Sequence, residues 1–480
     1  MKKMMLLLAA VILSAAAFGC QKNQTEPTTV APQGDETQTP PQEDRTAASD
    51  WDDDEFYFGD LSSERYDGYN YRILVRQGNT NTQYFEEPQE DIVDNAIYER
   101  NKYVENKFGV TITVSESSNP EYETDALNSI LAGDDAYDVI FPHARAAFSY
   151  AVQGACANLR DISSLHLDKP WWAADIVESC TINGKLYVLD GDISTSGLSA
   201  THCLYFNKRI FDDLGFEYPY DMVRSGEWTF DEFAYLVRKG SADLNGDGLI
   251  DEDNDRYGFT TNMWSAPIVM PYTGGKRIYS KDESGKLFMS LYSDKTVNMY
   301  ASLFGLMNSV AAEYNLPSSV FKSGRLMFMD GGLGGAKSLR DMDDEFGIVP
   351  YPKYDEDDSY ATITNGVAPL MIMPITVADR ERSGAITEAL CAYGSRYVIP
   401  AFYDVTLKTK YSRDTESEEM MDIIRASRVF DLGYLAGGPF SSTGYELASS
   451  DSSNFASFYA ERKDQAQVSL DNFIRDYGGE

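Results

Sequence analysis

Residues 243–255 combine the side chains and the spacing of a calcium-binding loop. With Asp243 as position one, oxygen ligands fall at positions 1, 3, 5, 7 and 9 and glycine at position 6, as in an EF-hand loop. Position twelve is Asn254 rather than a bidentate acid, so an acidic neighbour has to complete the site. The alternative is an acidic surface turn whose carboxylates cap backbone amides. We expect a structural calcium ion held by Asp243, Asn245, Asp247, the Leu249 carbonyl, Asp251 and Asp255.

Cationic and imidazole side chains follow two expected strands. Arg76 comes after the strand at 71–75, and His143 and Arg145 come after the strand at 137–141. In open α/β sheets, ligands bind beyond the carboxyl ends of the strands. The planar guanidinium suits sugar hydroxyls or a carboxylate. These three residues are therefore candidate ligand contacts, and the alternative for each is a solvated loop residue.

The first twenty residues read as a lipoprotein signal. Lys2 and Lys3 precede an apolar stretch that ends at Ala17, too short for a transmembrane helix, which needs about 20 residues. A small residue, Gly19, stands directly before Cys20, whose thiol is the group that a lipid transferase alkylates. We expect residues 1–19 to be removed and Cys20 to carry the lipid. The alternative is an ordinary cleaved signal with an incidental cysteine.

Residues 20–65 predict a tether between the lipid and the folded protein. The segment is rich in Gln, Thr, Pro, Asp and Glu, and it has few large apolar side chains before Trp51. Such a composition cannot bury enough surface to offset the entropy of ordering the chain. We expect a disordered acidic spacer.

Composition limits the partners of the folded part. The formal net charge is −35, with only 41 Lys and Arg residues, so a nucleic-acid partner is not expected, because binding phosphates needs a basic face. The membrane is reached only through the lipid. The remaining length favours two domains. The other four cysteines lack metal-ligand spacing and are expected to be mostly buried free thiols.

Strands and helices alternate along the folded part, which favours an α/β fold. Short apolar strands are expected at 71–75, 110–114 and 137–141, and a helix is expected at 91–108. The GxGxxG, P-loop and HExxH motifs are absent from the sequence, so it gives no sign of an organic cofactor.

A series of motifs follows in a specific order. A strand at 204–208 ends in Asn-Lys and leads into a helix at 210–215, and Glu-Trp-Thr-Phe-Asp at 227–231 opens the next helix. Further motifs are Gly331-Gly332, Phe346–Lys353, Val367–Pro374 and Met420–Ile424. Together they resemble family 1 of the bacterial extracellular solute-binding proteins, the sugar-binding lipoproteins of ABC importers related to maltose-binding protein. The resemblance covers about residues 66–480.

That resemblance implies a type II periplasmic-binding-protein-like fold, with two discontinuous α/β lobes, a hinge, and a ligand gripped between the lobes. The first lobe would comprise 66–203 and 326–375, and the second 204–325 and 376–480. Trp264 would follow a strand in a loop that faces the cleft, with Tyr272 nearby. Asp192, just before the first crossing, would accept hydrogen bonds from ligand hydroxyls. Its neighbour Asp190 is the weaker candidate.

A binding protein for an ABC importer is the function that these features favour. Aromatic rings suit the apolar faces of sugars. Gly331 to Gly334 offer no tryptophan where maltose-type binders place one, which argues against large linear maltodextrins. The expected partners are a small solute, a carbohydrate first, and permease subunits, and we expect a monomer on the outer face of the cytoplasmic membrane. The alternatives are a secreted carbohydrate-active hydrolase and a sensing lipoprotein without transport.

Overall fold

The computed structural model of the chain describes residues 55–117, 122–407, 414–450 and 452–478. Its strands are β1 (Asn70–Arg76), β2 (Thr111–Ser117), β3 (Val139–Ile140), β4 (His202–Asn207), β5 (Tyr257–Thr261), β6 (Tyr279–Lys281), β7 (Leu287–Met289), β8 (Ala312–Tyr314), β9 (Leu326–Gly332), β10 (Phe346–Val349), β11 (Thr362–Ile363) and β12 (Arg428–Val429). Its helices up to the second sheet are α1 (Glu55–Phe58), η1 (Thr80–Thr82), α2 (Ile92–Phe108), α3 (Tyr122–Leu131), α4 (Ala144–Val152), η2 (Leu159–Asp161), α5 (Ala174–Ser179) and α6 (Ser196–Ser199). Those that follow are α7 (Lys208–Leu214), α8 (Tyr220–Ser225), α9 (Phe230–Gly240), α10 (Ala266–Thr273), α11 (Asp294–Met307), α12 (Ser318–Lys322), η3 (Leu333–Ser338), α13 (Arg380–Tyr393), η4 (Gly394–Val398), α14 (Ile399–Leu407), α15 (Glu416–Ala426), α16 (Leu432–Leu435), α17 (Thr443–Ser449) and α18 (Phe455–Gly478).

The first lobe is built on a parallel sheet with the order β2-β1-β3. β1 is mostly buried, as its apolar sequence predicts. α2 begins where the Asp91 carboxylate accepts the backbone amides of Val93 and Asp94, and it ends at Gly109 in the left-handed conformation. The expected strands and helix of this region are confirmed within one to three residues at most ends.

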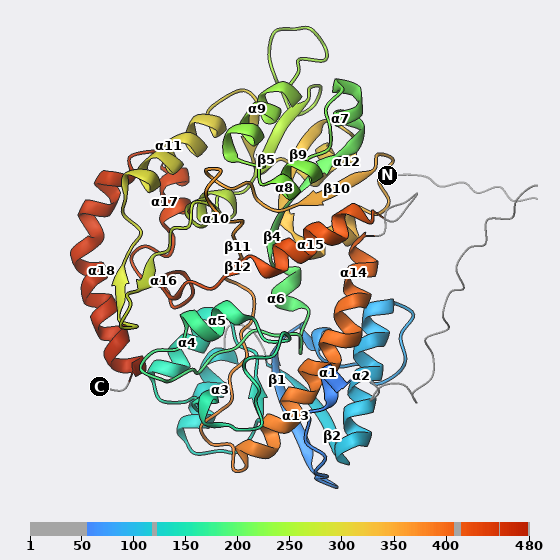
Figure 1. The fold of residues 1–480 in the computed structure, drawn as a ribbon, viewed down its shortest axis with the longest axis vertical. Coiled ribbons are helices and arrows are strands. Elements are labelled where there is room, and N and C mark those ends of the chain that lie inside the picture. The colour runs from blue at the N-terminus through green and yellow to red at the C-terminus, as the bar shows by residue number, and fades with distance from the viewer. Residues whose placement is uncertain (1–54, 118–121, 408–413, 451, 479–480) are drawn as a thin grey trace, which may run out of the picture. The chain divides into compact units, whose positions relative to one another are not determined.

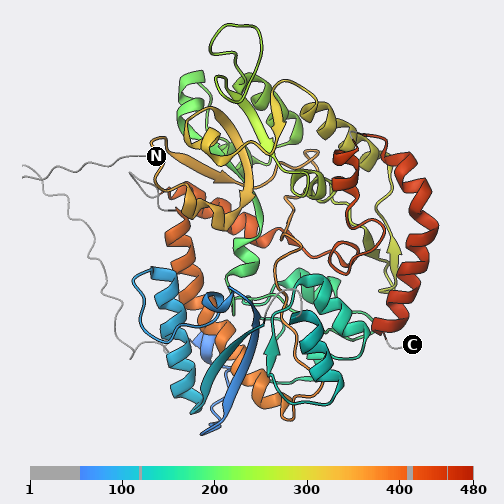
Figure 2. The same ribbon diagram turned by 180° about the vertical axis from the view of Figure 1, so that it is seen from behind.

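The second lobe contains a five-stranded sheet with the order β10-β4-β9-β5-β8. β4 is antiparallel to both of its neighbours, and β5 is parallel to β9 and β8. β4 and β5 are buried along their whole length. Figure 1 shows this sheet with α7, α9 and α12 around it, and Figure 2 shows the same arrangement from behind.

The lobe boundaries differ from the sequence-based expectation at two places. β9 and β10 pair with β4 and β5, so residues 326–349 belong to the second sheet rather than to the first lobe. The expectation failed because a buried apolar strand does not by itself specify which sheet it joins.

Helix α13, at the start of 376–480, packs on the first lobe instead of the second. The Tyr71 and Thr387 hydroxyls lie 2.7 Å apart. The Glu388 carboxylate accepts the indole N–H groups of Trp171 and Trp172, each at 3.0 Å. Residues 369–374 also lie on the first sheet, where Ile372 bridges Ile140. The chain therefore crosses between lobes at 194–201, at 364–368 and again after α13.

Helix α1 lies inside the segment predicted as a disordered tether, so the prediction is wrong for residues 55–58. Phe58 of α1 is buried and stacks on Tyr393 of α13 at a ring distance of 4.3 Å. Tyr57 and Phe58 explain this, because aromatic side chains gain free energy when they leave water for an apolar core. The predicted signal peptide, Cys20 and residues 21–54 lie outside the described residues. Among the helices that are described, none is long and apolar enough to cross a membrane.

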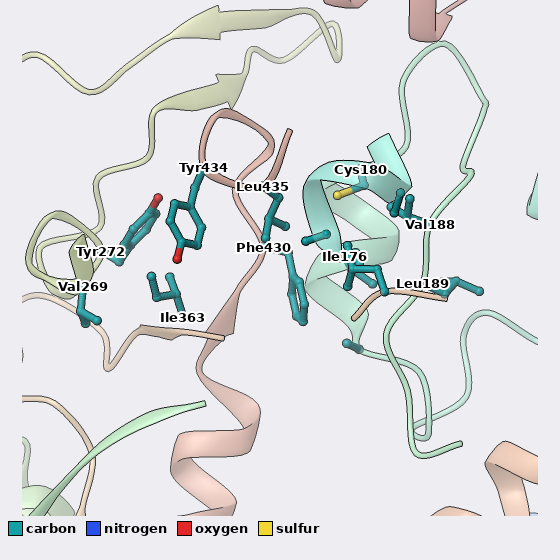
Figure 3. Packing of buried hydrophobic residues seen from close by; sticks show 14 of the residues in the cluster. Ile176, Cys180, Val188, Leu189, Val269, Tyr272, Ile363, Phe430, Tyr434 and Leu435 are labelled. Carbon is teal, nitrogen blue, oxygen red and sulfur yellow. The ribbon is translucent and has the colours of Figure 1, made fainter. Parts of the chain in front are cut away.

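Hydrophobic packing continues from one lobe to the other. Figure 3 shows Phe430 and Leu435 between Ile176 of α5 on one side and Tyr272 of α10 on the other. Cysteines 156, 180, 203 and 391 are buried free thiols, as expected. Burial raises the pKa of each thiol above its ordinary range, so these cysteines are chemically inert packing residues.

Candidate functional site

The carboxyl edge of the first sheet gathers three of the predicted ligand residues. Arg76 is the last residue of β1, and His143 and Arg145 lie at the start of α4, directly after β3. Burial, and then the positive charges of Arg76 and Arg145, lower the pKa of His143 to about 4. The imidazole is therefore neutral at pH 7.

A hydrogen bond to Nδ1 of His143 determines which ring nitrogen is left to donate to a ligand. Its Nδ1 accepts the backbone N–H of Arg145 at 3.2 Å and so caps α4. The proton of the neutral ring is then on Nε2, which is left as a donor. Two guanidinium groups and one imidazole N–H make this edge a cluster of donors for hydroxyl or carboxylate oxygens.

Arg145 joins this cluster to the C-terminal part of the second lobe. Its guanidinium donates to the Ser441 hydroxyl at 3.3 Å. Its side chain also passes Gly437, where an added Cβ would lie 3.4 Å from the Arg145 Nε. Gly437 has φ of 74°, so glycine is favoured there both by the backbone and by the close approach of the arginine.

Trp264 stands on a turn after β5 and is 45% exposed. The Asn262 side chain accepts the Trp264 backbone N–H at 2.8 Å and fixes the turn. The indole stacks on Tyr445 of α17, with ring centroids 4.0 Å apart and planes inclined by 13°. The pair forms an aromatic surface with an exposed edge. Sequence reasoning missed Tyr445, because nothing in the local pattern connects α17 to the turn after β5.

A buried carboxylate that sequence reasoning also missed supports this turn. Asp330 of β9 accepts the hydroxyls of Thr261 at 2.9 Å and Tyr351 at 2.7 Å, and its carboxylate lies 3.3 Å from Nδ1 of His202. Burial alone would raise the pKa of Asp330, but the His202 hydrogen bond and charge, with the Tyr351 hydroxyl, hold it below its usual value. Thr261 is the last residue of β5, so the network fixes the strand end that carries Trp264. The sequence signal that could have found it is an acid directly before Gly331-Gly332.

Asp192 and Tyr272 are not brought to this group of residues. Asp192 is buried and forms an ion pair with Arg425 of α15, and Tyr272 is buried and donates to Asp431 at 3.1 Å. Asp190 likewise pairs with Arg428 at 2.6 Å. Asp190 and Asp192 thus bind arginines of the second lobe, and Tyr272 binds a carboxylate within its own lobe, rather than a ligand.

A cavity of about 860 Å³ lies beside these ion pairs, between α5 and the end of α15. Lys169, Asp175, Lys281, Arg425 and Arg428 are among its charged lining residues. Burial raises the pKa of both Asp190 and Asp192 against the opposing charge of their arginine partners. The cavity shares no residue with the group around Trp264.

The predicted calcium loop is a series of acid-capped turns. Asp243 accepts the backbone amides of Gly246 at 2.6 Å and Gly248 at 2.7 Å, and Asp247 accepts that of Leu249 at 2.8 Å. Asp255 accepts the amides of Leu244 and Asp251 and closes the base of the loop. Across the part of the chain that the structure describes, no group of three or more His, Cys, Asp or Glu side chains is arranged to hold a metal ion. Calcium binding stays a prediction.

The model of a known protein family matches the chain over residues 100–392, and that family is the bacterial extracellular solute-binding proteins. This chain belongs to that family. The expected fold class is confirmed, and the chain is a member of a family of extracellular binding proteins. A comparison with curated protein sequences gave no match.

Solved structures of binding proteins share the fold at low identity. A sugar transporter protein from Rhizobium etli in an open conformation is 14% identical, with a TM-score of 0.59, covering 86% of this chain and 100% of that one. The ABC substrate-binding protein from Listeria monocytogenes in complex with cycloalternan is 14% identical, with a TM-score of 0.52 and coverage of 86% and 100%. The GacH receptor of Streptomyces glaucescens, solved unliganded and with acarbose, is 15% identical, with a TM-score of 0.53 and coverage of 85% and 97%.

Proposed function

We propose that this solute-binding protein captures a carbohydrate between its lobes and delivers it to the permease of an ABC importer. The stacked pair of Trp264 and Tyr445 carries the proposal. Sugars present apolar C–H faces that pack on aromatic rings, while their hydroxyls need hydrogen-bond partners. The half-exposed indole offers the first kind of contact.

The donors of the first lobe supply the second kind of contact. Arg145 donates to Ser441, which lies two positions before helix α17 and four positions before its Tyr445. The Arg145–Ser441 hydrogen bond and the few residues from Ser441 to Tyr445 therefore link the cluster of donors to the aromatic pair. A ligand held between these groups would touch both lobes, as hinge closure around a solute requires.

A sugar panel tests this proposal. Purified protein is screened by thermal shift against maltotetraose, a cyclic glucan, acarbose, ribitol and glucose, and each positive is measured by calorimetry. We expect at least one member to raise the melting temperature, because a ligand that binds only the native state stabilises it. Arg145→Gln should weaken that binding, whereas Arg238→Gln on the exposed face of α9 should not. A panel extended to amino acids and peptides that gives only peptide binding would contradict the carbohydrate proposal.

We also propose that the protein is anchored outside the cell by a lipid on Cys20. The support is the short apolar segment that ends at a small residue before this cysteine. Cys20→Ser should leave a protein without lipid, either unprocessed or released into the medium. Metabolic labelling that still places acyl chains on the variant would contradict the anchor.

A further inference from the structure

Helix α18 spans from one lobe to the other. It runs from Phe455 to Gly478 and is 24 residues long, or about 36 Å at the ordinary helical rise. Figures 1 and 2 both show it along one edge of the molecule, from beside α11 of the second lobe to the neighbourhood of α4 of the first. The resemblance implies that residues 376–480 belong to the second lobe alone, so the contact of α18 with the first lobe is a finding of the structure.

The N-terminal end of α18 is fixed in the second lobe by aromatic packing. Phe455 is fully buried and lies 5.1 Å from Tyr300 of α11. Tyr459 packs on Tyr292 at 4.8 Å and on Phe440 at the same distance. One turn further on, Arg462 forms an ion pair with Glu446 of α17 at 3.1 Å. This end is held by several rings and a charge pair.

The C-terminal end is inserted into the first lobe by fewer groups. Tyr477 is 1% exposed, packs edge-on against Tyr187 at 4.9 Å, and donates its hydroxyl to the carbonyl of Cys180 at 2.9 Å. Phe473, which is only half-buried, approaches Phe148 of α4 at 6.2 Å. Detaching α18 from the first lobe therefore costs less free energy than detaching it from the second lobe.

Among the described residues, the lobes are also joined by the crossing segments near 194–201, 364–368 and the end of α13, and by the ion pairs of Asp192 with Arg425 and of Asp190 with Arg428. An uninterrupted α-helix curves only gently, because a sharp kink needs a proline, a bulge or another break in its backbone hydrogen bonds. If both ends of α18 stay in place, the lobes cannot change their mutual orientation by much. A change of orientation needs the Tyr477 end to slide or leave its pocket.

We propose that α18 is a strap whose first-lobe end limits the opening and closing of the lobes and so sets the affinity for the solute. The affinity part rests on the proposed function, in which the solute binds between the lobes. A bound solute shifts lobe orientation only by its differential affinity for the two arrangements. Weakening the strap changes the ratio of those arrangements, and therefore the apparent Kd changes with it.

Two variants weaken the strap in different ways. Phe473→Ala removes one of the two rings at the first-lobe end. Val468→Gly leaves both ends intact and loosens the middle of the helix, because Val468 is 59% exposed and glycine is a poor helix former. Val468→Ala is the matched control for the helix. Phe216→Ala is the control for the ring, since Phe216 is half-buried and packs only within the second lobe, on Phe211.

Lobe orientation is measured without any ligand by the distance between two spin labels. Labels are attached at Glu99→Cys on α2 and Lys322→Cys on α12, both exposed, in a Cys20→Ser background. The four other native cysteines are buried and stay unlabelled. Wild type and both controls should give the same narrow distribution. Both strap variants should give a broadened or displaced one.

Denaturation curves show that each variant is folded before its distances are compared. If folded Phe473→Ala and Val468→Gly give the wild-type distribution, the strap is contradicted, whether or not any sugar binds. Where a member of the sugar panel binds, its Kd should change at least threefold in both strap variants. By linkage, the Kd falls if that sugar moves the labels in the same direction as the variants, and it rises if the direction is opposite. Altered distances with an unchanged Kd would overturn the role of the strap in affinity.

Discussion

At the scale of single residues, the chemistry of the site depends on the environment as much as on residue type. His143 is a donor because α4 takes its Nδ1 and because burial, with the neighbouring arginines, lowers its pKa and keeps it uncharged. Asp192 is the opposite case. It stands just before the first crossing, where the resemblance implies a ligand contact, but Arg425, 233 positions away, takes its carboxylate. A pairing over that separation leaves no local sequence pattern, whereas the strand-end positions themselves were predictable from the apolar strands.

The pKa of His143 can be measured and shifted. Arg76→Gln should raise it above about 4, without restoring the ordinary value of 6.5, because burial is the larger cause. A histidine whose pKa is lowered in the native state binds fewer protons there than in the unfolded chain, so stability rises with pH between about 4 and 6.5 and falls as the pH drops through that window. In Arg76→Gln, stability should therefore rise less steeply with pH over this window.

NMR titration of the imidazole protons checks the shift. The chain has only three histidines, and His143→Gln assigns the signal. Lys169→Gln, which removes a cation elsewhere, should leave the pKa unchanged. An unaltered His143 titration in Arg76→Gln would show that the guanidinium is not close enough to act on the ring.

At the scale of elements, most boundaries could be read from the sequence. α9 begins inside the motif at 227–231 that is expected to open a helix, where Thr229 accepts the backbone amide of Glu232. α7 ends at Gly215 in the left-handed conformation, as expected. The partners of each element could not be read in the same way. β9 has the apolar pattern of a buried strand in either sheet, and only the pairing with β4 and β5 places it in the second lobe.

The loop at 243–255 is an element whose role a metal titration decides. If it binds calcium, the ion should raise the melting temperature, by about 2.7 kcal/mol of stability at a concentration 100-fold above Kd. Asp243→Ala and Asp247→Ala should abolish the increment. Asp282→Ala should keep it, because Asp282 caps amides in a similar turn outside the loop. A wild-type melting curve that chelator leaves unmoved would identify the loop as an acid-capped turn.

At the scale of the whole molecule, the resemblance predicted two lobes and a hinge, and family membership with the shared fold agrees. What it could not supply is how the C-terminal segments divide between the lobes. α13 packs on the first lobe, and α18 reaches both, because Glu388 and Tyr477 find partners far away in the sequence. Contacts of that kind depend on the assembled surfaces and not on local periodicity.

The central claim is that a sugar binds on the aromatic surface of Trp264 between the lobes, and Trp264→Ala tests it. Loss of a stacking ring costs about 0.5–1.5 kcal/mol beyond the buried area, which contributes about 25 cal/mol per Å². We expect a loss of about 2–3 kcal/mol, or about 30- to 150-fold in Kd. The denaturation midpoint should stay close to that of wild type, because Trp264 is 45% exposed.

The measurement is calorimetric titration of Trp264→Ala with the tightest-binding member of the sugar panel, alongside a denaturation curve. Phe288→Ala is the matched control, since Phe288 is also 45% exposed and lies on β7, away from the turn after β5. The account predicts a weakened Kd in Trp264→Ala with an unchanged midpoint, and a wild-type Kd in Phe288→Ala. An unchanged Kd in Trp264→Ala would contradict it and remove the aromatic pair from the binding site.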